Sequence, residues 1–124
     1  MLTSFLGGII TNLHKPKMKT NIIVKLEHTA THYWERCDIE EVMYLKYPHR
    51  HNFYFVCKKE VAHDDRDIEI IMLKDSIKGF LNEIYPKTFG GMSCESIAKE
   101  LVYSFDLDYC SVLEDNENGA EVTR

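Results

Sequence analysis

The sequence predicts an α+β fold whose elements follow the order ββααββ. Three observations carry this prediction: two β-type stretches near the start, two amphipathic helical patterns in the middle and a hairpin signal near the end. A chain of 124 residues has room for one domain with a single modest core. We expect residues 18–124 to form this domain and residues 1–17 to be an N-terminal arm or tail.

Two strands are predicted before the helices. Residues 20–32 alternate between apolar and polar side chains and end on His32. Residues 48–59 are rich in aromatic side chains, and the proline at their start is tolerated because no ladder donor is needed there. The mixed and acidic stretch 33–47 is therefore interpreted as a long connection with a helical turn.

Two helices are expected next. Residues 68–72 are interpreted as an extension of a strand, and residues 73–85 carry an apolar stripe at helical spacing. Pro86 and a Gly-Gly pair close this helix. The second helix begins after Ser93, a candidate N-cap, and has its apolar face as far as Phe105.

The last part of the chain predicts a pair of strands. These cover residues 108–113 and 120–123, and residues 115–119 form the turn between them. The Asn-Gly pair at 118–119 is a strong hairpin signal, because both residues accept the positive φ of a two-residue turn.

Composition excludes several classes of partner. The formal net charge is −5 and Lys and Arg form no block, so we expect no nucleic-acid partner. No apolar run approaches the roughly 20 residues of a membrane span, so we expect no membrane partner. The four cysteines form no Cys-x-x-Cys pair, and no secretion signal is recognised. We therefore expect reduced thiols and a cytoplasmic protein.

The histidines give the clearest functional signal. His49 and His51 are two residues apart on a predicted strand, so their side chains point to the same face. His32 ends the preceding strand and would supply a third imidazole. Three histidines with one open position form a ligand set that catalytic zinc uses. The alternative is that two of the chain's six histidines are two apart by chance.

These residues also resemble a known family. Ala-Thr-His at 30–32 and His-Arg-His at 49–51 look like the 6-pyruvoyltetrahydropterin synthase and 6-carboxytetrahydropterin synthase family. Ser-Cys-Glu-Ser-Ile-Ala at 93–98 resembles the family's Thr-(Ala/Ser)-Glu-Asn-(Leu/Ile)-Ala opening of the second helix, and Val-Leu-Glu at 112–114 resembles its late strand. The resemblance covers residues 20–123 and implies the tunnelling fold, a four-stranded antiparallel sheet with two helices on one face.

The resemblance implies a zinc enzyme with a ring-binding pocket. The zinc ligands would be His32, His49 and His51. Glu114 would accept paired hydrogen bonds from a pterin or purine-like ring, with Ser93 and Glu95 as further substrate-binding residues. The reaction would be a lyase step on a dihydroneopterin triphosphate-like side chain, of the kind that feeds biopterin or 7-deazaguanine pathways. The family also implies a trimer-based homo-oligomer, a hexamer, with active sites at subunit interfaces.

The chain departs from the family in its acid and base residues. The family's catalytic cysteine stands four residues before the His-x-His pair, where this chain has Leu45. Cys37 lies in the same connection and is the candidate replacement. The family's Asp-His pair after the first helix is absent, because residues 82–92 contain neither residue type. Two alternatives therefore stay open: a tunnelling-fold module that binds a pterin or purine nucleotide without turnover, and a structural domain with an incidental histidine cluster.

Overall fold

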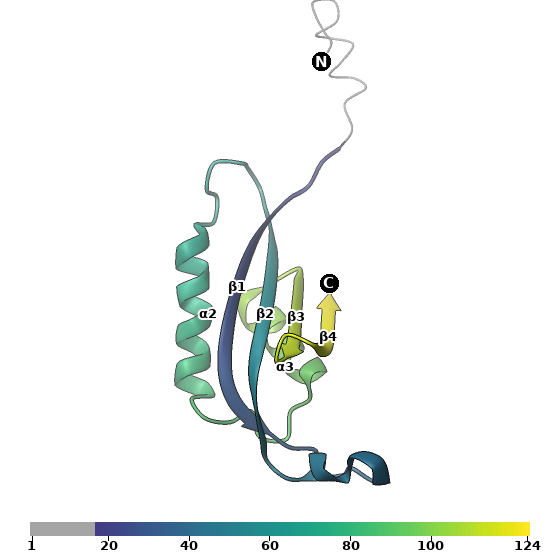
Figure 1. The fold of residues 1–124 in the computed structure, drawn as a ribbon. Coiled ribbons are helices and arrows are strands. Elements are labelled where there is room, and N and C mark those ends of the chain that lie inside the picture. Colours follow the sequence, from purple (N-terminus) through teal and green to yellow (C-terminus); the bar gives the residue numbers. More distant parts are fainter. Residues whose placement is uncertain (1–16) are drawn as a thin grey trace, which may run out of the picture.

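The computed structural model describes residues 17–124, and it confirms the α+β class and the order ββααββ (Figure 1). The proposed arm lies outside the described residues except for Lys17. The elements are β1 (Thr20–His32), the 3₁₀ helix η1 (Glu40–Lys46), β2 (His49–Val61), α2 (Ile70–Ile84), α3 (Cys94–Phe105), β3 (Tyr109–Glu114) and β4 (Asn118–Thr123). The four strands form one antiparallel sheet in the order β1-β2-β3-β4. No helix within residues 17–124 is both long enough and apolar enough to span a membrane.

The β1–β2 ladder sets which side chains share a face. The register pairs Thr20 with Val61 at one end and His32 with His49 at the other. Burial alternates along β1, so that its even-numbered residues from 24 to 32 point inward. The odd-numbered residues of β2 occupy the same face, because directly opposed residues of an antiparallel pair point the same way.

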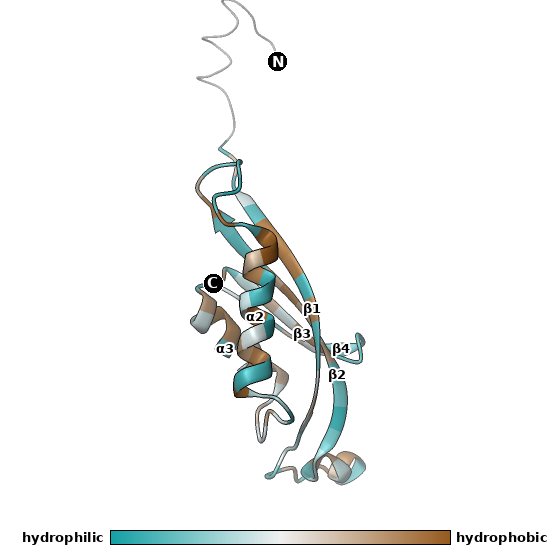
Figure 2. Cartoon of the chain, turned by 90° about the vertical axis from the view of Figure 1, so that its left-hand side faces the viewer, coloured by the Kyte–Doolittle hydropathy of each residue, from teal (hydrophilic) through white to brown (hydrophobic). Residues whose placement is uncertain are grey.

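Both helices cover this inward face of the sheet, as Figures 1 and 2 show. The first helix, α2, packs on β1 with Ile77 and Leu81, and α3 packs on β3 and β4. The core between these layers is centred on the fully buried rings of Phe53 and Phe55. The opposite face of the sheet carries the alternating exposed side chains of β1 and is left uncovered by helices.

Two details of the sequence-based prediction are wrong. Residues 68–72 do not extend a strand, because Glu69 caps α2 by accepting a hydrogen bond from the Met72 N–H at 3.0 Å. The apolar residues that follow this cap are largely exposed on the first turn of α2, so they form no buried strand. Asn118 and Gly119 do not form the turn either; they belong to β4, and the turn is residues 115–117, with Asp115 and Asn116 at positive φ. The β3–β4 hairpin itself is confirmed.

Candidate metal centre

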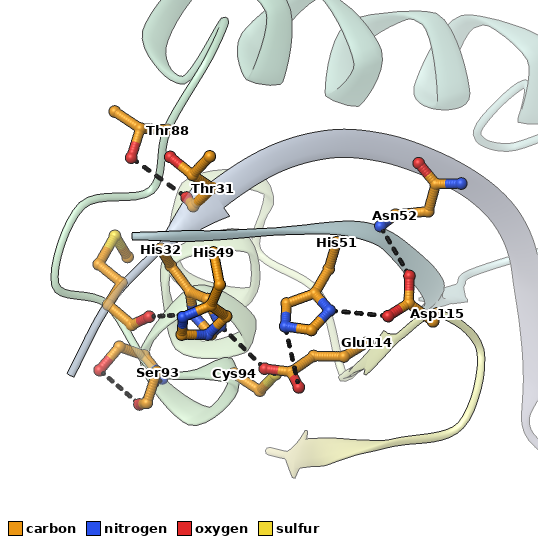
Figure 3. A network of polar contacts seen from close by, with 12 residues as sticks. Thr31, His32, His49, His51, Asn52, Thr88, Ser93, Cys94, Glu114 and Asp115 are labelled. Atoms are coloured by element: carbon orange, nitrogen blue, oxygen red, sulfur yellow. Dashed lines mark hydrogen bonds and ion pairs between the residues drawn. The ribbon is translucent and has the colours of Figure 1, made fainter. Parts of the chain in front are cut away.

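Three imidazoles meet where β1 ends and β2 begins (Figure 3). The register places His32 directly opposite His49, and His51 follows one pleat further along β2. One ring nitrogen from each histidine lies within 4.8 Å of those of the other two. The predicted histidine cluster therefore forms in the structure and is able to hold a metal ion.

Each imidazole is held by a hydrogen-bond acceptor at Nδ1. His32 donates to the backbone oxygen of Met92 at 2.9 Å, and His49 donates to that of Tyr47 at 2.8 Å. The third, His51, donates to the carboxylate of Asp115 at 2.7 Å. A carbonyl or carboxylate oxygen only accepts, so the proton of each neutral ring sits on Nδ1. The Nε2 lone pairs are consequently left free, which is the tautomer that metal-binding histidines use.

The free nitrogens fit a cation. Nε2 of His32 and Nε2 of His51 are buried and have no hydrogen-bond partner among the described residues. A buried polar atom without a partner costs about 1–3 kcal/mol. A metal ion bound by these nitrogens would remove that cost, and imidazole suits zinc, copper, iron and nickel.

Burial keeps His32 in the neutral form that can bind a metal ion. Burial lowers the pKa of His32 from its usual 6.5, against smaller opposing effects from the Met92 carbonyl and Glu114. His32 is therefore neutral at pH 7. The pKa of Asp115 is also lowered, mainly because it accepts the hydrogen bond of His51 and also that of the Asn52 N–H. The acceptor beneath His51 is accordingly a carboxylate, which favours a cation at the far side of that ring.

A loop tied to β1 supplies the acceptor for His32. The Thr31 N–H donates to the Lys87 oxygen at 3.0 Å, and the Phe89 N–H donates to the Thr31 oxygen at 2.8 Å. The Thr88 hydroxyl donates to the same Thr31 oxygen at 3.1 Å (Figure 3). These bonds fix the chain between α2 and α3 against the end of β1, and so place the Met92 oxygen beside the imidazole of His32.

Glu114 lies against two of the three histidines. It is the last residue of β3 and pairs with Phe53, so its side chain shares the inward face. Its carboxylate oxygens are 3.0 Å from Nε2 of His32 and 3.5 Å from Nε2 of His51. The Cys94 thiol donates to the same carboxylate at 3.6 Å. Burial, followed by the charge of Glu114, raises the pKa of Cys94 to about 12, so Cys94 is a thiol and not a thiolate at neutral pH.

A cavity of about 370 Å³ opens beside the histidines. Two of its wall residues are aromatic, Tyr33 and Trp34. The start of α3 also lines it with Ser93 and Glu95, which the sequence predicted as substrate-binding residues. Ser93 is confirmed as the N-cap of α3, because its hydroxyl oxygen accepts the Ser96 N–H at 3.1 Å. Leu45 and Glu114 also line the cavity.

Cys37, the candidate catalytic residue, is placed elsewhere. Its side chain is buried, and its thiol points to the backbone oxygens of Ile39 and Val42 at 3.9 and 3.5 Å. It does not line the cavity beside the histidines. The structure therefore does not bring Cys37 together with the other predicted site residues, and its catalytic role stays a prediction.

Three parts of the site were missed by sequence reasoning. Asp115 was interpreted as a turn residue, Cys94 only as part of a helix opening, and the backbone oxygens of Tyr47 and Met92 carry no sequence signal. The position of Asp115 directly after Glu114 was the one available hint. Because Asp115 directly follows the end of β3, its carboxylate reaches the neighbouring strand β2, where it accepts the Asn52 N–H.

Comparison with known proteins does not assign the chain to a family. No family model matches the chain, and no curated protein matches it. The resemblance to the tetrahydropterin synthase family therefore stays a prediction from the sequence motifs.

Proposed function

We propose that the protein is a zinc-dependent enzyme with lyase chemistry on a pterin or purine-derived substrate, resembling 6-carboxytetrahydropterin synthase. One observation carries the proposal: three histidine nitrogens converge, each ring held at Nδ1, beside a cavity lined with aromatic and carboxylate side chains. The tunnelling fold is part of the same proposal, supported by the four-stranded antiparallel sheet and the two helices on one of its faces.

The cavity suits a flat, nitrogen-rich ring. Its volume of about 370 Å³ lies at the small end of the range for ligand pockets. Tyr33 and Trp34 offer faces for stacking. Glu95 and Glu114 offer carboxylates, which accept two parallel hydrogen bonds from adjacent N–H groups of one ring edge. Ser93 adds a hydroxyl at the start of α3.

The histidines would hold zinc, which when bound supplies Lewis acidity towards substrate oxygens. The chain itself contributes by orienting the three imidazole rings. Asp115 and the backbone oxygens of Tyr47 and Met92 fix the three rings, so that ligand nitrogens face a common point before the metal arrives.

A second candidate is a module that binds the same ring without turnover. The state and position of the two thiols Cys94 and Cys37 favour it. Cys94 is protonated at neutral pH, and Cys37 points to backbone oxygens away from the cavity. Neither thiol is thus arranged as a general base. Removing a general base typically lowers the reaction rate about 10²–10⁴-fold. A site without a general base can therefore still bind the ring while converting it very slowly.

Assembly into a trimer-based hexamer is also proposed. The helices cover one face of the sheet, and β1 and β4 are its two edge strands. Uncovered faces and edges favour pairing with further copies of the chain. Light scattering at micromolar concentration tests this, and a monomer would count against it.

Metal content and turnover test the proposal together. Elemental analysis of the purified protein should give near one zinc per chain, and His51→Ala should give none. His63→Ala is the matched control, because His63 is a surface histidine with its side chain 58% exposed. Stoichiometric zinc in His51→Ala would overturn the assignment. Product from a dihydropterin triphosphate supports the enzyme, whereas a raised Tm without product supports the binding module.

A further inference from the structure

Five electron-rich atoms converge at the histidine cluster. Three are ring nitrogens of the histidines, among them Nε2 of His32 and of His51, and two are the carboxylate oxygens of Glu114 (Figure 3). Glu114 lies on the side of the cluster formed by His32 and His51, at 3.0 and 3.5 Å. His49 supplies the remaining nitrogen of the cluster.

These contacts are not hydrogen bonds. The proton of His32 is on Nδ1, where it is donated to Met92, and the proton of His51 is on Nδ1, where it is donated to Asp115. Both Nε2 atoms lack a hydrogen-bond partner among residues 17–124, although a carboxylate oxygen lies within 3.5 Å of each. Where the ring is neutral, the Nε2 lone pair and the carboxylate oxygen repel at this separation. A cation between them turns the repulsion into attraction.

The separations match those between two ligands of one metal ion. Bond lengths of about 2.0–2.2 Å to nitrogen and oxygen, with tetrahedral angles, put two ligand atoms roughly 3.3–3.5 Å apart. The observed 3.5 Å falls within this range, and the observed 3.0 Å lies below it, as an angle at the metal narrower than tetrahedral would give. An ion pair between a protonated His32 and Glu114 would instead place the oxygen in line with a ring N–H, and that hydrogen bond is not formed.

We propose that Glu114 is the fourth ligand of the metal, so that the resting site has three histidines and one carboxylate. This inference rests on the metal site of the proposed function. It gives Glu114 a different role from the ring anchoring that the resemblance implies, and leaves Glu95 as the cavity carboxylate able to hold a ring.

A fourth protein ligand makes the resting site a closed one. Closed four-coordinate sites are typical of structural zinc, whereas catalytic zinc keeps a position for water or substrate. A substrate oxygen would therefore reach the metal only when the Glu114 carboxylate swings away or when the coordination number rises to five. Cys94 is placed to receive the carboxylate, because its thiol already donates to Glu114 from the α3 side.

Metal affinity tests the fourth ligand directly. Zinc affinity is measured by competition with a chromophoric chelator for the wild type, Glu114→Gln and Glu95→Gln. Loss of a partner that only orients a ligand costs about 10–100-fold in affinity, so loss of a ligand itself should cost about 100-fold or more in Glu114→Gln. Glu95→Gln removes the same charge from the same cavity and should leave the affinity near that of the wild type.

Cobalt substitution gives a second readout that does not depend on affinity. The visible absorption bands of Co²⁺ should shift in Glu114→Gln and stay in place in Glu95→Gln. Glu114→Asp keeps the charge and should retain more of the affinity than Glu114→Gln, which guards against a variant that merely misfolds. Circular dichroism of each metal-free variant checks the fold.

The outcomes separate this inference from the function on which it rests. Unchanged affinity and an unchanged cobalt spectrum in Glu114→Gln would overturn the fourth ligand and leave the three-histidine site intact. A second outcome is that Glu114→Gln binds zinc more weakly, while the wild type neither binds nor converts any pterin or purine. That outcome would support the fourth ligand and overturn the proposed function. No zinc binding by the wild type would overturn both.

Discussion

Asp115 accepts the Nδ1 hydrogen bond of His51 at 2.7 Å, while its other oxygen accepts the Asn52 N–H at 3.1 Å. The turn that carries Asp115 is thereby fastened to the strand that carries two of the three histidines. Asp115 is itself at positive φ, a conformation that Asp and Asn accept more easily than most residues. A residue at the tip of a hairpin thus determines the orientation of an imidazole on a neighbouring strand.

Asp115→Asn should therefore weaken metal binding while leaving the fold intact. Asparagine tolerates the positive φ of the turn but loses the charge that strengthens the hydrogen bond from His51. Loss of such an orienting partner typically costs about 10–100-fold in metal affinity, and chelator competition measures it. Glu117→Gln changes the same charge in the same turn and should bind metal like the wild type. Equal affinities for all three proteins would show that Asp115 does not orient His51.

Removing the metal should lower the thermal stability of the wild type. A ligand at 100 times its dissociation constant stabilises the folded state by about 2.7 kcal/mol. For a domain of this size that corresponds to a fall in Tm of roughly 10 °C when the metal is stripped by a chelator. Differential scanning calorimetry with and without the chelator measures the change.

His51→Ala provides the control for this experiment, because it removes one of the three donor nitrogens. Its Tm should be the same before and after the chelator. If the chelator leaves the Tm of the wild type unchanged, the three histidines hold no metal in solution.

The strands could be predicted because their pattern has a period of two. Alternation in residues 20–32 and the aromatic run after residue 48 indicated β1 and β2, and both formed. The start of α2 was misplaced because three consecutive apolar residues at 70–72 resemble a buried strand. They are exposed instead, and the cap formed by Glu69 begins the helix there.

The three-histidine cluster could also be predicted, but its surroundings could not. His49 and His51 share a face because of their spacing alone, and only the register showed that His32 is opposite His49. The acceptor for His32 depends on how the loop before α3 is pinned to Thr31, which is a tertiary hydrogen-bond pattern with no local sequence signature. For the same reason Cys37, near the histidines in sequence, could not be placed without the fold.

Gly119→Ala should destabilise the protein by about 1–3 kcal/mol, as overpacking does. A Cβ at this position would fall on the backbone oxygen of Val112 and 2.8 Å from the Leu113 Cα. These backbone atoms belong to the hydrogen-bonded strand pair β3–β4, so they cannot move away as a flexible side chain can. The glycine is thus required by close approach of β3 and not by turn geometry. Urea unfolding measures the loss.

Gly79→Ala is the matched control, and it should act in the opposite direction. Gly79 lies inside α2, and nothing is within 4 Å of the position of an added Cβ. Alanine there should stabilise the protein by about 0.5–1 kcal/mol, because glycine has the greater conformational freedom to lose on folding. Equal effects of the two substitutions would refute the account of Gly119.

Asp106 should contribute to acid sensitivity. Hydrogen bonds from Arg124 and then from Lys59 lower its pKa from the usual 3.8. A carboxyl group with a lowered pKa in the folded state adds stability that is present above its unfolded pKa and is lost as the pH falls through its folded pKa. Asp106→Asn, which suits the positive φ at this position, should therefore be less stable than the wild type at pH 7. The difference should disappear as the pH is lowered below about 4.

Urea unfolding from pH 7 down to pH 2 measures this convergence. Because Asp106 and Arg124 are at the surface, 1 M salt should shrink the difference at pH 7 as well. A gap between the wild type and Asp106→Asn that stays constant from pH 7 to pH 2 would mean that the charge of Asp106 makes no contribution. The loss would then have to come from the shape of the turn after α3, where Asp106 is the C-cap.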